Sequence, residues 1–156
     1  MDAILRQIRG IADFQFGNGA GELLFPEDVN IVYSKNTGRI RHITHKNQLI
    51  ASFRPTDGLF TLSIKGAERL INQMQGFDYI VEIMDEISEF PSGGSDVFAK
   101  HVVNAGCVVK PGDEVIVVDS RFNVLAVGKA LMNKTEMLIF KTGVAVRVRK
   151  GRDKNR

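Results

Sequence analysis

The chain has 156 residues, of which 44% are hydrophobic and 25% are charged, as in ordinary globular proteins and unlike disordered or fibrous chains. No apolar run approaches the roughly 20 residues of a membrane helix, and charged side chains interrupt the first 14 residues, which excludes a secretory signal peptide. We therefore expect a cytoplasmic protein with no membrane partner, long enough for one ordinary domain or two small ones.

Basic residues are concentrated in the second half of the chain. Residues 79–90 carry four acidic side chains and no basic one, whereas residues 91–156 carry 12 basic and 6 acidic side chains, a net charge of +6. This asymmetry is typical of proteins that bind polyanions. A basic tail that only aids solubility gives the same pattern, and charge alone does not separate the two interpretations.

The first half predicts a small α+β unit. Apolar residues at helical spacing indicate a helix over residues 2–14, capped by Asp2. The glycine-rich segment 17–22 follows a helix rather than a strand, so we interpret it as a turn and not as a phosphate-binding loop. A second helix is predicted over residues 65–74, with Gly76 at its end. Between the helices, alternating patterns and short turns predict an antiparallel meander of four strands, at residues 29–34, 39–44, 48–54 and 58–63.

The second half predicts a small β-barrel. Ser95 is placed to cap a short helix through about Asn104, which Gly106 ends, and a further helical piece is expected at 133–138. Closely spaced strands with few helices favour a closed or partly open barrel. The tail after Lys150 is expected to be frayed. Strands are predicted at residues 79–84, 114–119, 124–131 and 143–149, with a short apolar run at 107–109.

The sequence offers little for catalysis or metal binding. His42 and His45 lie three apart on a predicted strand, so their side chains should point to opposite faces, which disfavours a shared metal. The single cysteine, Cys107, lies in an apolar run, where a small buried thiol is commoner than a nucleophile. The carboxylates of residues 82–89 indicate a solvated strand face and loop, with an acid–base pair as the weaker alternative. We expect no enzyme activity, no cofactor and no metal.

The last predicted strand carries the clearest binding signal. Strand alternation places Arg147 and Arg149 on one face, where two neighbouring guanidiniums suit phosphate contacts. On the expected 95–104 helix, Lys100 and Asn104 share a polar side, and Lys110 follows at the next turn. A set of unrelated surface charges remains the alternative.

Both halves resemble parts of one known architecture. The segments VFAKHVV, KPGDEVIVVD, LAVGKALMNKTEM and KTGVAVRVRKG closely resemble the PUA domain, named for pseudouridine synthases and archaeosine transglycosylases. The upstream segments QFGNGAGELLF, SKNTGRIRHI and ASFRPTDGLFTLSIKGAERL are similar to the small domain that precedes the PUA domain in archaeosine tRNA-guanine transglycosylases. The resemblance covers about residues 10–151. It implies an α+β fold with a cystatin-like domain of helices and antiparallel sheet at 1–76, a PUA barrel at 77–151 and a basic tail at 152–156.

The resemblance implies a non-catalytic module that binds tRNA or another structured RNA. In the enzymes, a large N-terminal barrel supplies the catalytic aspartates and the zinc site, and this sequence contains no such region, so we carry over RNA binding and not base exchange. An accessory subunit that grips RNA for a separately encoded tRNA-modification enzyme is the alternative. The positions implied for RNA contact are Lys100, Asn104, Gly106, Cys107, Lys110, Arg147, Arg149 and Lys150.

The aromatic content predicts a mode of recognition. The chain has no tryptophan, two tyrosines and ten phenylalanines, and we expect most of the phenylalanines in the core. Binding of unstructured single strands needs exposed rings on which bases stack, whereas duplex RNA is read mainly through its backbone and shape. We therefore expect a preference for a stem with a short single-stranded end over unstructured RNA.

Overall fold

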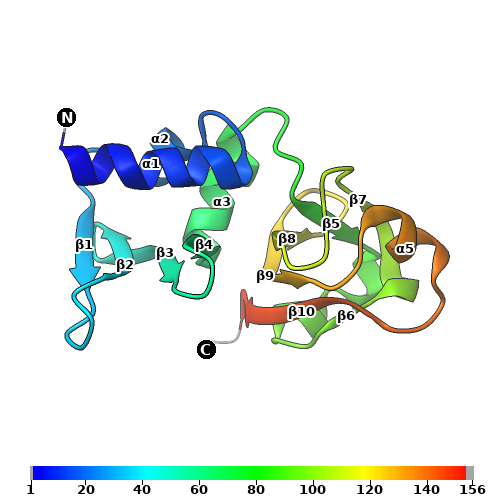
Figure 1. The fold of residues 1–156 in the computed structure, drawn as a ribbon. Helices are drawn as coiled ribbons and strands as arrows, with labels where there is room; N and C mark the ends of the chain where they lie inside the picture. Colours follow the sequence, from blue (N-terminus) through cyan, green and yellow to red (C-terminus); the bar gives the residue numbers. More distant parts are fainter. Residues whose placement is uncertain (1, 154–156) are drawn as a thin grey trace. The chain divides into compact units, whose positions relative to one another are not determined.

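The structure of the protein is a computed structural model, and it describes residues 2–153. The chain divides into two units, Met1–Phe77 and Asp78–Arg156, called unit 1 and unit 2 below. Each unit has its own sheet, the first with four strands and the second with six (Figure 1). None of the helices in the described part of the chain combines the length and apolar character needed to cross a membrane.

Unit 1 is an antiparallel sheet with three helices, in the sheet order β1-β2-β3-β4. The predicted meander and both predicted helices are confirmed. The turn predicted over residues 17–22 is shorter than expected, because an additional short helix begins within it at Ala20. The elements are α1 (Ala3–Phe16), α2 (Ala20–Leu24), β1 (Asn30–Tyr33), β2 (Ile40–His45), β3 (Gln48–Arg54), β4 (Leu59–Leu62) and α3 (Ile64–Gln73).

Local chemistry explains how the unit 1 helices begin and where they dock. The Asp2 carboxylate accepts a hydrogen bond from the Ile4 amide at 3.0 Å, and the Ser63 hydroxyl accepts one from the Gly66 amide at 3.0 Å, which caps α1 and α3. The Gln15 side chain joins α1 to β4 through two 2.8 Å hydrogen bonds with the Phe60 backbone. Gly76 lies just past the end of α3 as expected, and it is the second residue, not the first, beyond Met74, which caps the helix.

Unit 2 is a curled, barrel-like sheet in the order β6-β10-β9-β8-β5-β7. The β5–β8 pair is parallel and the other pairs are antiparallel. Its core is built mainly from valine and alanine side chains on the inner face, such as Val115, Val117 and Ala126. The elements are β5 (Ile80–Ile83), η1 (Asp85–Ile87), α4 (Glu89–Ser92), β6 (Val97–Phe98), η2 (Ala99–His101), β7 (Val102–Ala105), β8 (Glu114–Val118), β9 (Val124–Ala130), α5 (Lys134–Ile139) and β10 (Val144–Gly151).

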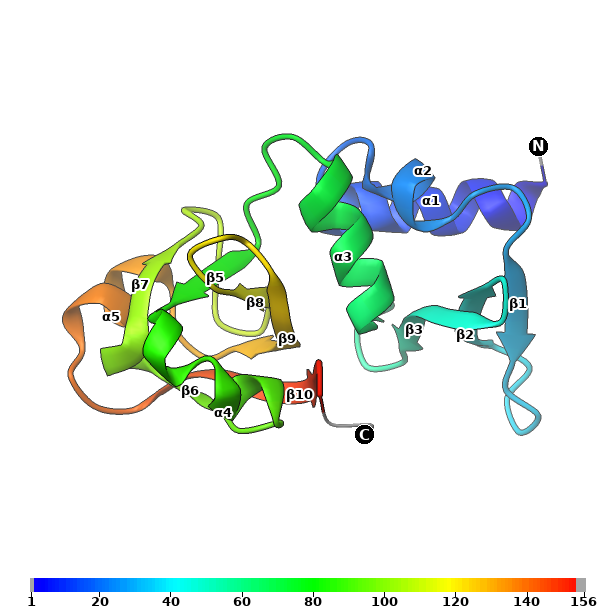
Figure 2. The same cartoon turned by 180° about the vertical axis from the view of Figure 1, so that it is seen from behind.

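The helix expected over residues 95–104 is wrong. The segment forms β6, one 3₁₀ turn and β7 instead, and β7 pairs with β5 through the registers Val81↔Ala105 and Ile83↔Val102. Two successive β-branched valines at 102 and 103 favour a strand, and pairing with β5 satisfies the backbone groups. The structure instead has a short helix, α4, in a stretch that the sequence indicated as a loop; Figure 2 shows it beside β10, which it contacts.

Two further expectations are corrected. The Arg152 amide donates to the Leu125 carbonyl and the Asp153 amide to the Ser92 carbonyl, each at 2.8 Å, so residues 151–153 are not frayed; residues 154–156 of the predicted tail lie outside the described residues.

Half of the ten phenylalanines are exposed rather than in the core, namely Phe14, Phe90, Phe98, Phe122 and Phe140. Exposed rings on which bases could stack are therefore present, which removes the aromatic argument for stems, while the preference for stems itself stays a prediction.

Candidate nucleic-acid interface

The loop after β7 is fixed by the close approach of Gly106 to the chain at Asp78. The Gly106 amide donates to the Ile80 carbonyl at 2.9 Å, and a Cβ at this position would lie 1.5 Å from the Asp78 carbonyl oxygen. No side chain other than hydrogen fits there. Gly106 is itself buried, so its part in the site is to set the course of the loop.

The same loop borders a shallow hollow of about 380 Å³, called the turn hollow below. Cys107 is exposed rather than buried as expected, because residues 107 and 108 form a turn instead of a strand. The Lys134 ammonium lies 3.7 Å from the Cys107 sulfur. The lining residues are Cys107, Val109, Lys110, Asn133, Lys134 and Thr135, two of which are lysines and none of which is acidic.

Lys134 is a residue of this surface that the sequence interpretation missed. Asn133 caps α5 by accepting a hydrogen bond from the Glu136 amide, and the Glu136 side chain accepts one from the Asn133 amide, both at 2.9 Å. This capping box fixes Lys134 as the first residue of the helix. The N-K-T-E pattern was the available signal, but only the fold brings α5 to the loop after β7.

Lys100 and Asn104 are both exposed, yet they do not share a helical face. Lys100 lies in η2, and Asn104 lies on β7 opposite Glu82 of β5. Helix α5 contacts both η2 and β7. These two residues therefore lie on elements next to the one that carries Lys134.

A second group of cations lies on neighbouring strands β9 and β10. Arg147 is directly opposite Lys129, and Lys129 is directly opposite Glu114 on β8. Arg147 and Lys129, called the strand site below, are exposed, and neither forms an ion pair within residues 2–153. Like charges directly opposite each other destabilise a sheet. A bound anion such as phosphate relieves that repulsion.

Arg149 differs from Arg147, contrary to the expected pair of equivalent guanidiniums. It forms a two-pronged ion pair with Glu114, with 2.7 Å between Arg149 Nη1 and Glu114 Oε1. The Glu114 side chain is fully buried, whereas that of Arg149 is 38% exposed. The ladder with β9 shifts register at this point, so Val148 faces Gly128 and Lys150 faces Val127. A β-bulge of this kind changes the direction of a side chain. The Arg149 guanidinium is therefore used to pair with Glu114 within the fold.

Within the acidic segment 82–89, the Asp85 carboxylate is engaged by Ser120. The Ser120 hydroxyl and amide donate hydrogen bonds to the Asp85 carboxylate at 2.6 and 2.9 Å, and these bonds, the hydroxyl's first, hold the pKa of Asp85 below its usual value. A carboxyl with a lowered pKa is a poor general acid at neutral pH. In the part of the chain that the structure describes, no group of three or more His, Cys, Asp or Glu residues is arranged to hold a metal ion.

Family comparisons divide the chain in two. Residues 6–76 match the patch-forming domain C2 of tRNA-guanine transglycosylase, and residues 79–152 match the PUA domain. The tRNA-guanine(15) transglycosylase of Methanothermobacter thermautotrophicus is 43% identical over 150 residues, covering 94% of this chain and 22% of the relative. That of Thermococcus kodakarensis is 41% identical over 150 residues, covering 96% of this chain and 25% of the relative. The chain thus spans about a quarter of the length of these curated relatives.

Solved structures share the fold over most of the chain. A hypothetical protein from Pyrococcus horikoshii superposes with a TM-score of 0.75 at 21% identity, covering 94% of this chain and 89% of the other. A PUA-domain structure from Aeropyrum pernix gives a TM-score of 0.70 at 13% identity, covering 97% of this chain and 84% of the other. At these identities the likeness concerns the fold alone.

Proposed function

From the matches of residues 6–76 to the transglycosylase C2 domain and of residues 79–152 to the PUA domain, we propose that the chain binds structured RNA, with tRNA as the candidate ligand, and does not itself catalyse base exchange. Its relatives of about 40% identity are named for an enzyme that acts on tRNA. The chain spans about a quarter of the length of those enzymes, and the Asp85 carboxylate is engaged by Ser120.

The observation that carries the proposal is the strand site. Lys129 and Arg147 face each other across β9 and β10 with no ion-pair partner among the described residues. Arginine recognises phosphate oxygens in a two-pronged geometry, and lysine contributes a compact charge. On the next strand, β8, Glu114 lies opposite Lys129, and its carboxylate forms an ion pair with Arg149. The exposed side of the strand site is therefore positive.

We assign the other predicted positions different parts in the same surface. Lys100, Lys110 and Lys134 supply further phosphate contacts, and Asn104 and Cys107 supply neutral contacts beside them. Lys150 is half-buried at the end of β10 and contributes charge at the edge. Gly106 and Arg149 act indirectly, because one sets the course of the loop and the other neutralises Glu114.

Titration of the purified chain with fluorescently labelled tRNA at several salt concentrations tests this function. Neutralising three to five phosphates predicts a log–log salt slope of about −2 to −4.5. Micromolar or tighter binding at physiological salt is expected of the isolated chain. Absence of binding, or binding that does not change with salt, contradicts the proposal.

A second candidate function is that of an accessory subunit which docks on a separately encoded tRNA-modification enzyme and grips its RNA. The observation that favours it is an apolar patch at the end of α5, where Leu138, Ile139 and Phe140 are all exposed, Ile139 by 66%. Exposed apolar patches of this kind are typical of protein interfaces. Binding of tRNA only in the presence of such an enzyme, together with loss of that effect in Ile139→Lys, distinguishes this function from the first.

A further inference from the structure

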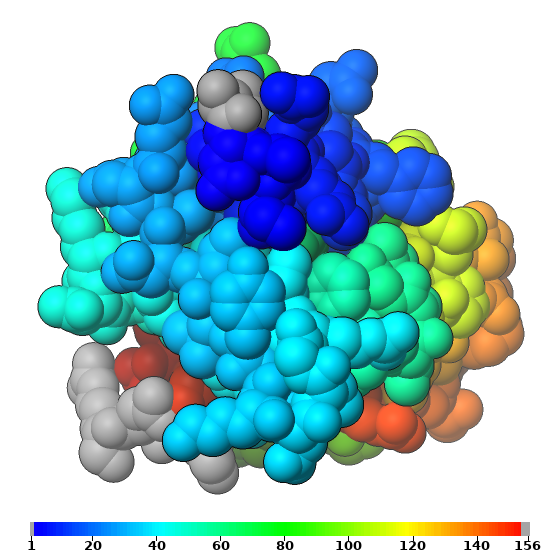
Figure 3. All heavy atoms as spheres, turned by 60° about the vertical axis from the view of Figure 1, so that its left-hand side comes forward, coloured from blue at the N-terminus to red at the C-terminus, as the bar shows by residue number. Residues whose placement is uncertain are grey.

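Unit 1 contains a hollow of about 450 Å³ that plays no part in the RNA surface of unit 2. It lies between α1 and the hairpin of β1 and β2, and a smaller hollow of about 210 Å³ adjoins it and shares Arg39, Ile40, Phe53 and Pro55. Figure 3 views unit 1 from the side on which the dark-blue helix α1 lies above the light-blue and cyan hairpin. The larger volume is within the range of small-molecule sites, about 300–1,000 Å³.

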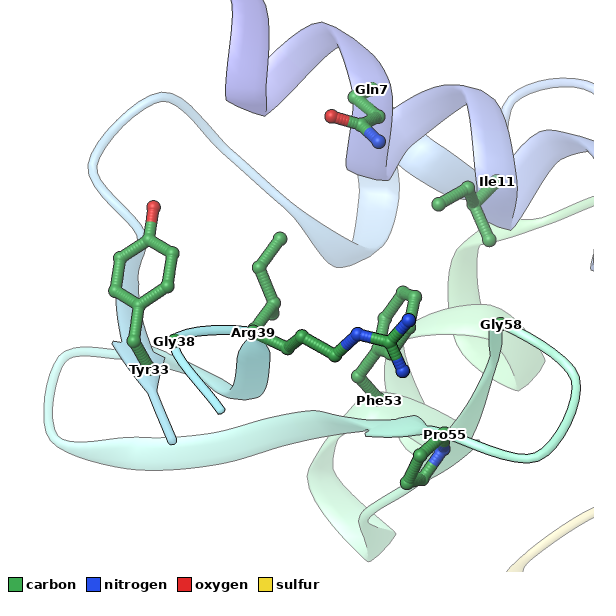
Figure 4. A pocket seen from close by; sticks show the side chains of 9 residues that line it. Gln7, Ile11, Tyr33, Gly38, Arg39, Phe53, Pro55 and Gly58 are labelled. Atoms are coloured by element: carbon green, nitrogen blue, oxygen red, sulfur yellow. The ribbon is translucent and has the colours of Figure 1, made fainter. Parts of the chain in front are cut away.

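The polar groups around the hollow suit an anion. Figure 4 shows the Arg39 side chain extending from the β1–β2 turn towards the Phe53 and Pro55 side. Arg41 lines the adjoining hollow, and among residues 2–153 no acidic side chain lines either one. Asp57, which precedes the lining residue Gly58, is held by Arg54 in a 2.7 Å ion pair. Within residues 2–153 the Arg39 guanidinium forms no ion pair, so its charge is available to a ligand.

The remaining walls suit a flat apolar ring. Ile11 and Ile40 are apolar, Pro55 presents a saturated apolar ring, and Phe53 and Tyr33 present aromatic rings from two different strands. Phe53 meets the buried Phe60 edge to face, with ring centroids 5.5 Å apart, so its orientation is set by the core before any ligand arrives. Tyr33 is 49% exposed and, with Gln7 across from it on α1 (Figure 4), supplies hydrogen-bonding groups at the mouth.

We propose that this hollow binds one nucleotide, with the base against Phe53, Pro55 and Tyr33 and the phosphate on Arg39 and Arg41. A base is flat and stacks on aromatic rings, and a phosphate matches the fork of an arginine. An acidic peptide would satisfy the arginines but not the aromatic walls. The nucleotide comes either from an RNA strand or from the free pool. In the first case the inference rests on the proposed function, because the hollow becomes a second point of contact for the same RNA.

The direct test is a titration of the ¹⁵N-labelled full chain with each of the four nucleoside 5′-monophosphates, followed by amide NMR shifts. We expect shifts confined to unit 1 at residues 33–41 and 53–58, and binding at least about tenfold weaker for ribose 5-phosphate, which lacks the stacking base. Equal binding of ribose 5-phosphate, or shifts of unit 2 amides alone, overturns the proposal.

Two variants sharpen the test. Arg39→Gln keeps a polar side chain but removes the charge, and we expect about tenfold weaker nucleotide binding. Arg6→Gln is the matched control, because Arg6 is exposed on the same helix as Gln7 and does not line the hollow, and it should bind as the unmodified chain does. Equal loss in both variants indicates general attraction of anions and refutes a built site.

RNA-binding measurements distinguish a nucleotide that belongs to an RNA strand from one of the free pool. They also distinguish failure of the nucleotide site from failure of the proposed RNA-binding function. If the nucleotide belongs to RNA, Arg39→Gln weakens binding of a tRNA stem carrying a single-stranded end and leaves binding of a fully paired hairpin unchanged. Unchanged binding of both RNAs, with mononucleotide binding lost, assigns the hollow to the free nucleotide. Failure of the proposed function is a different result, in which tRNA does not bind while the mononucleotide still shifts unit 1.

Discussion

The loop after β7 and strand β10 both contribute to the proposed RNA surface, yet the two regions are held in different ways. In the loop, close backbone packing of Gly106 against the Asp78 carbonyl sets the course of the chain. In β10, an ion pair with the buried Glu114 sets the direction of the Arg149 side chain, while Arg147 faces outward. In each region a residue that maintains the fold is a near neighbour of one that faces solvent, so stability and RNA binding should respond to different substitutions.

The largest effect is expected from Gly106→Ala. The added methyl group has no space beside the Asp78 carbonyl oxygen, so the loop must move or β7 must separate from β5. We expect a loss of about 3 kcal/mol or more in the free energy of unfolding, measured by urea denaturation. Gly10→Ala is the control, since nothing lies within 4 Å of a Cβ there, and a helical alanine should stabilise the protein slightly. Similar stability of the two variants would contradict the close approach at Gly106.

The next effect is expected from Arg149→Met. The substitution keeps much of the side-chain volume but takes the two-pronged guanidinium from the fully buried Glu114. We expect a loss of about 2–3 kcal/mol in the free energy of unfolding, because a buried carboxylate then loses its principal charge partner. Arg147→Met, two residues away, should change stability by less than about 0.5 kcal/mol. Equal losses of unfolding free energy in the two variants would contradict the different roles assigned to Arg147 and Arg149.

For RNA binding, in contrast to stability, we expect Arg147 and its neighbour Lys129 to matter more than Arg149. Alanine at both Lys129 and Arg147 removes two cations without disturbing a buried group. We expect tRNA affinity to fall about tenfold or more, and the magnitude of the log–log salt slope to decrease by about 1 to 2. The thermal unfolding midpoint should stay close to that of the unmodified chain. A salt slope that does not change would remove the strand site from the RNA surface.

The smallest effect is expected in the loop, from Asp113→Asn. Asp113 accepts hydrogen bonds from the Lys110 amide at 2.9 Å and ammonium at 3.1 Å, and asparagine still accepts the first. Lys110 is 70% exposed, so the ion pair contributes little to stability. Freed from its counter-charge, Lys110 should raise tRNA affinity about two- to threefold. Weaker binding would mean that Asp113 itself takes part in the interface.

Much of the fold follows from local patterns in the sequence. Alternation of apolar residues, the short turns between the alternating segments, and Asp2 as a capping residue predict the meander, both helices of unit 1 and most strands of unit 2. The motifs of the two halves also predict the two domain types that the family comparisons match, over residues 6–76 and 79–152. These features are local, because each depends on residues within about ten positions of one another.

Only the tertiary structure decided which cations are available for binding. Segment 95–104 forms strands that pair with β5 and β10 instead of a helix. Lys134 lines the turn hollow with Cys107 from 27 positions away, and Arg149 meets Glu114 from 35 positions away. A charged side chain gives the same signal in the sequence whether it faces water or a buried partner. The difference arises from desolvation and pairing across strands, which exist only once distant parts of the chain are packed together.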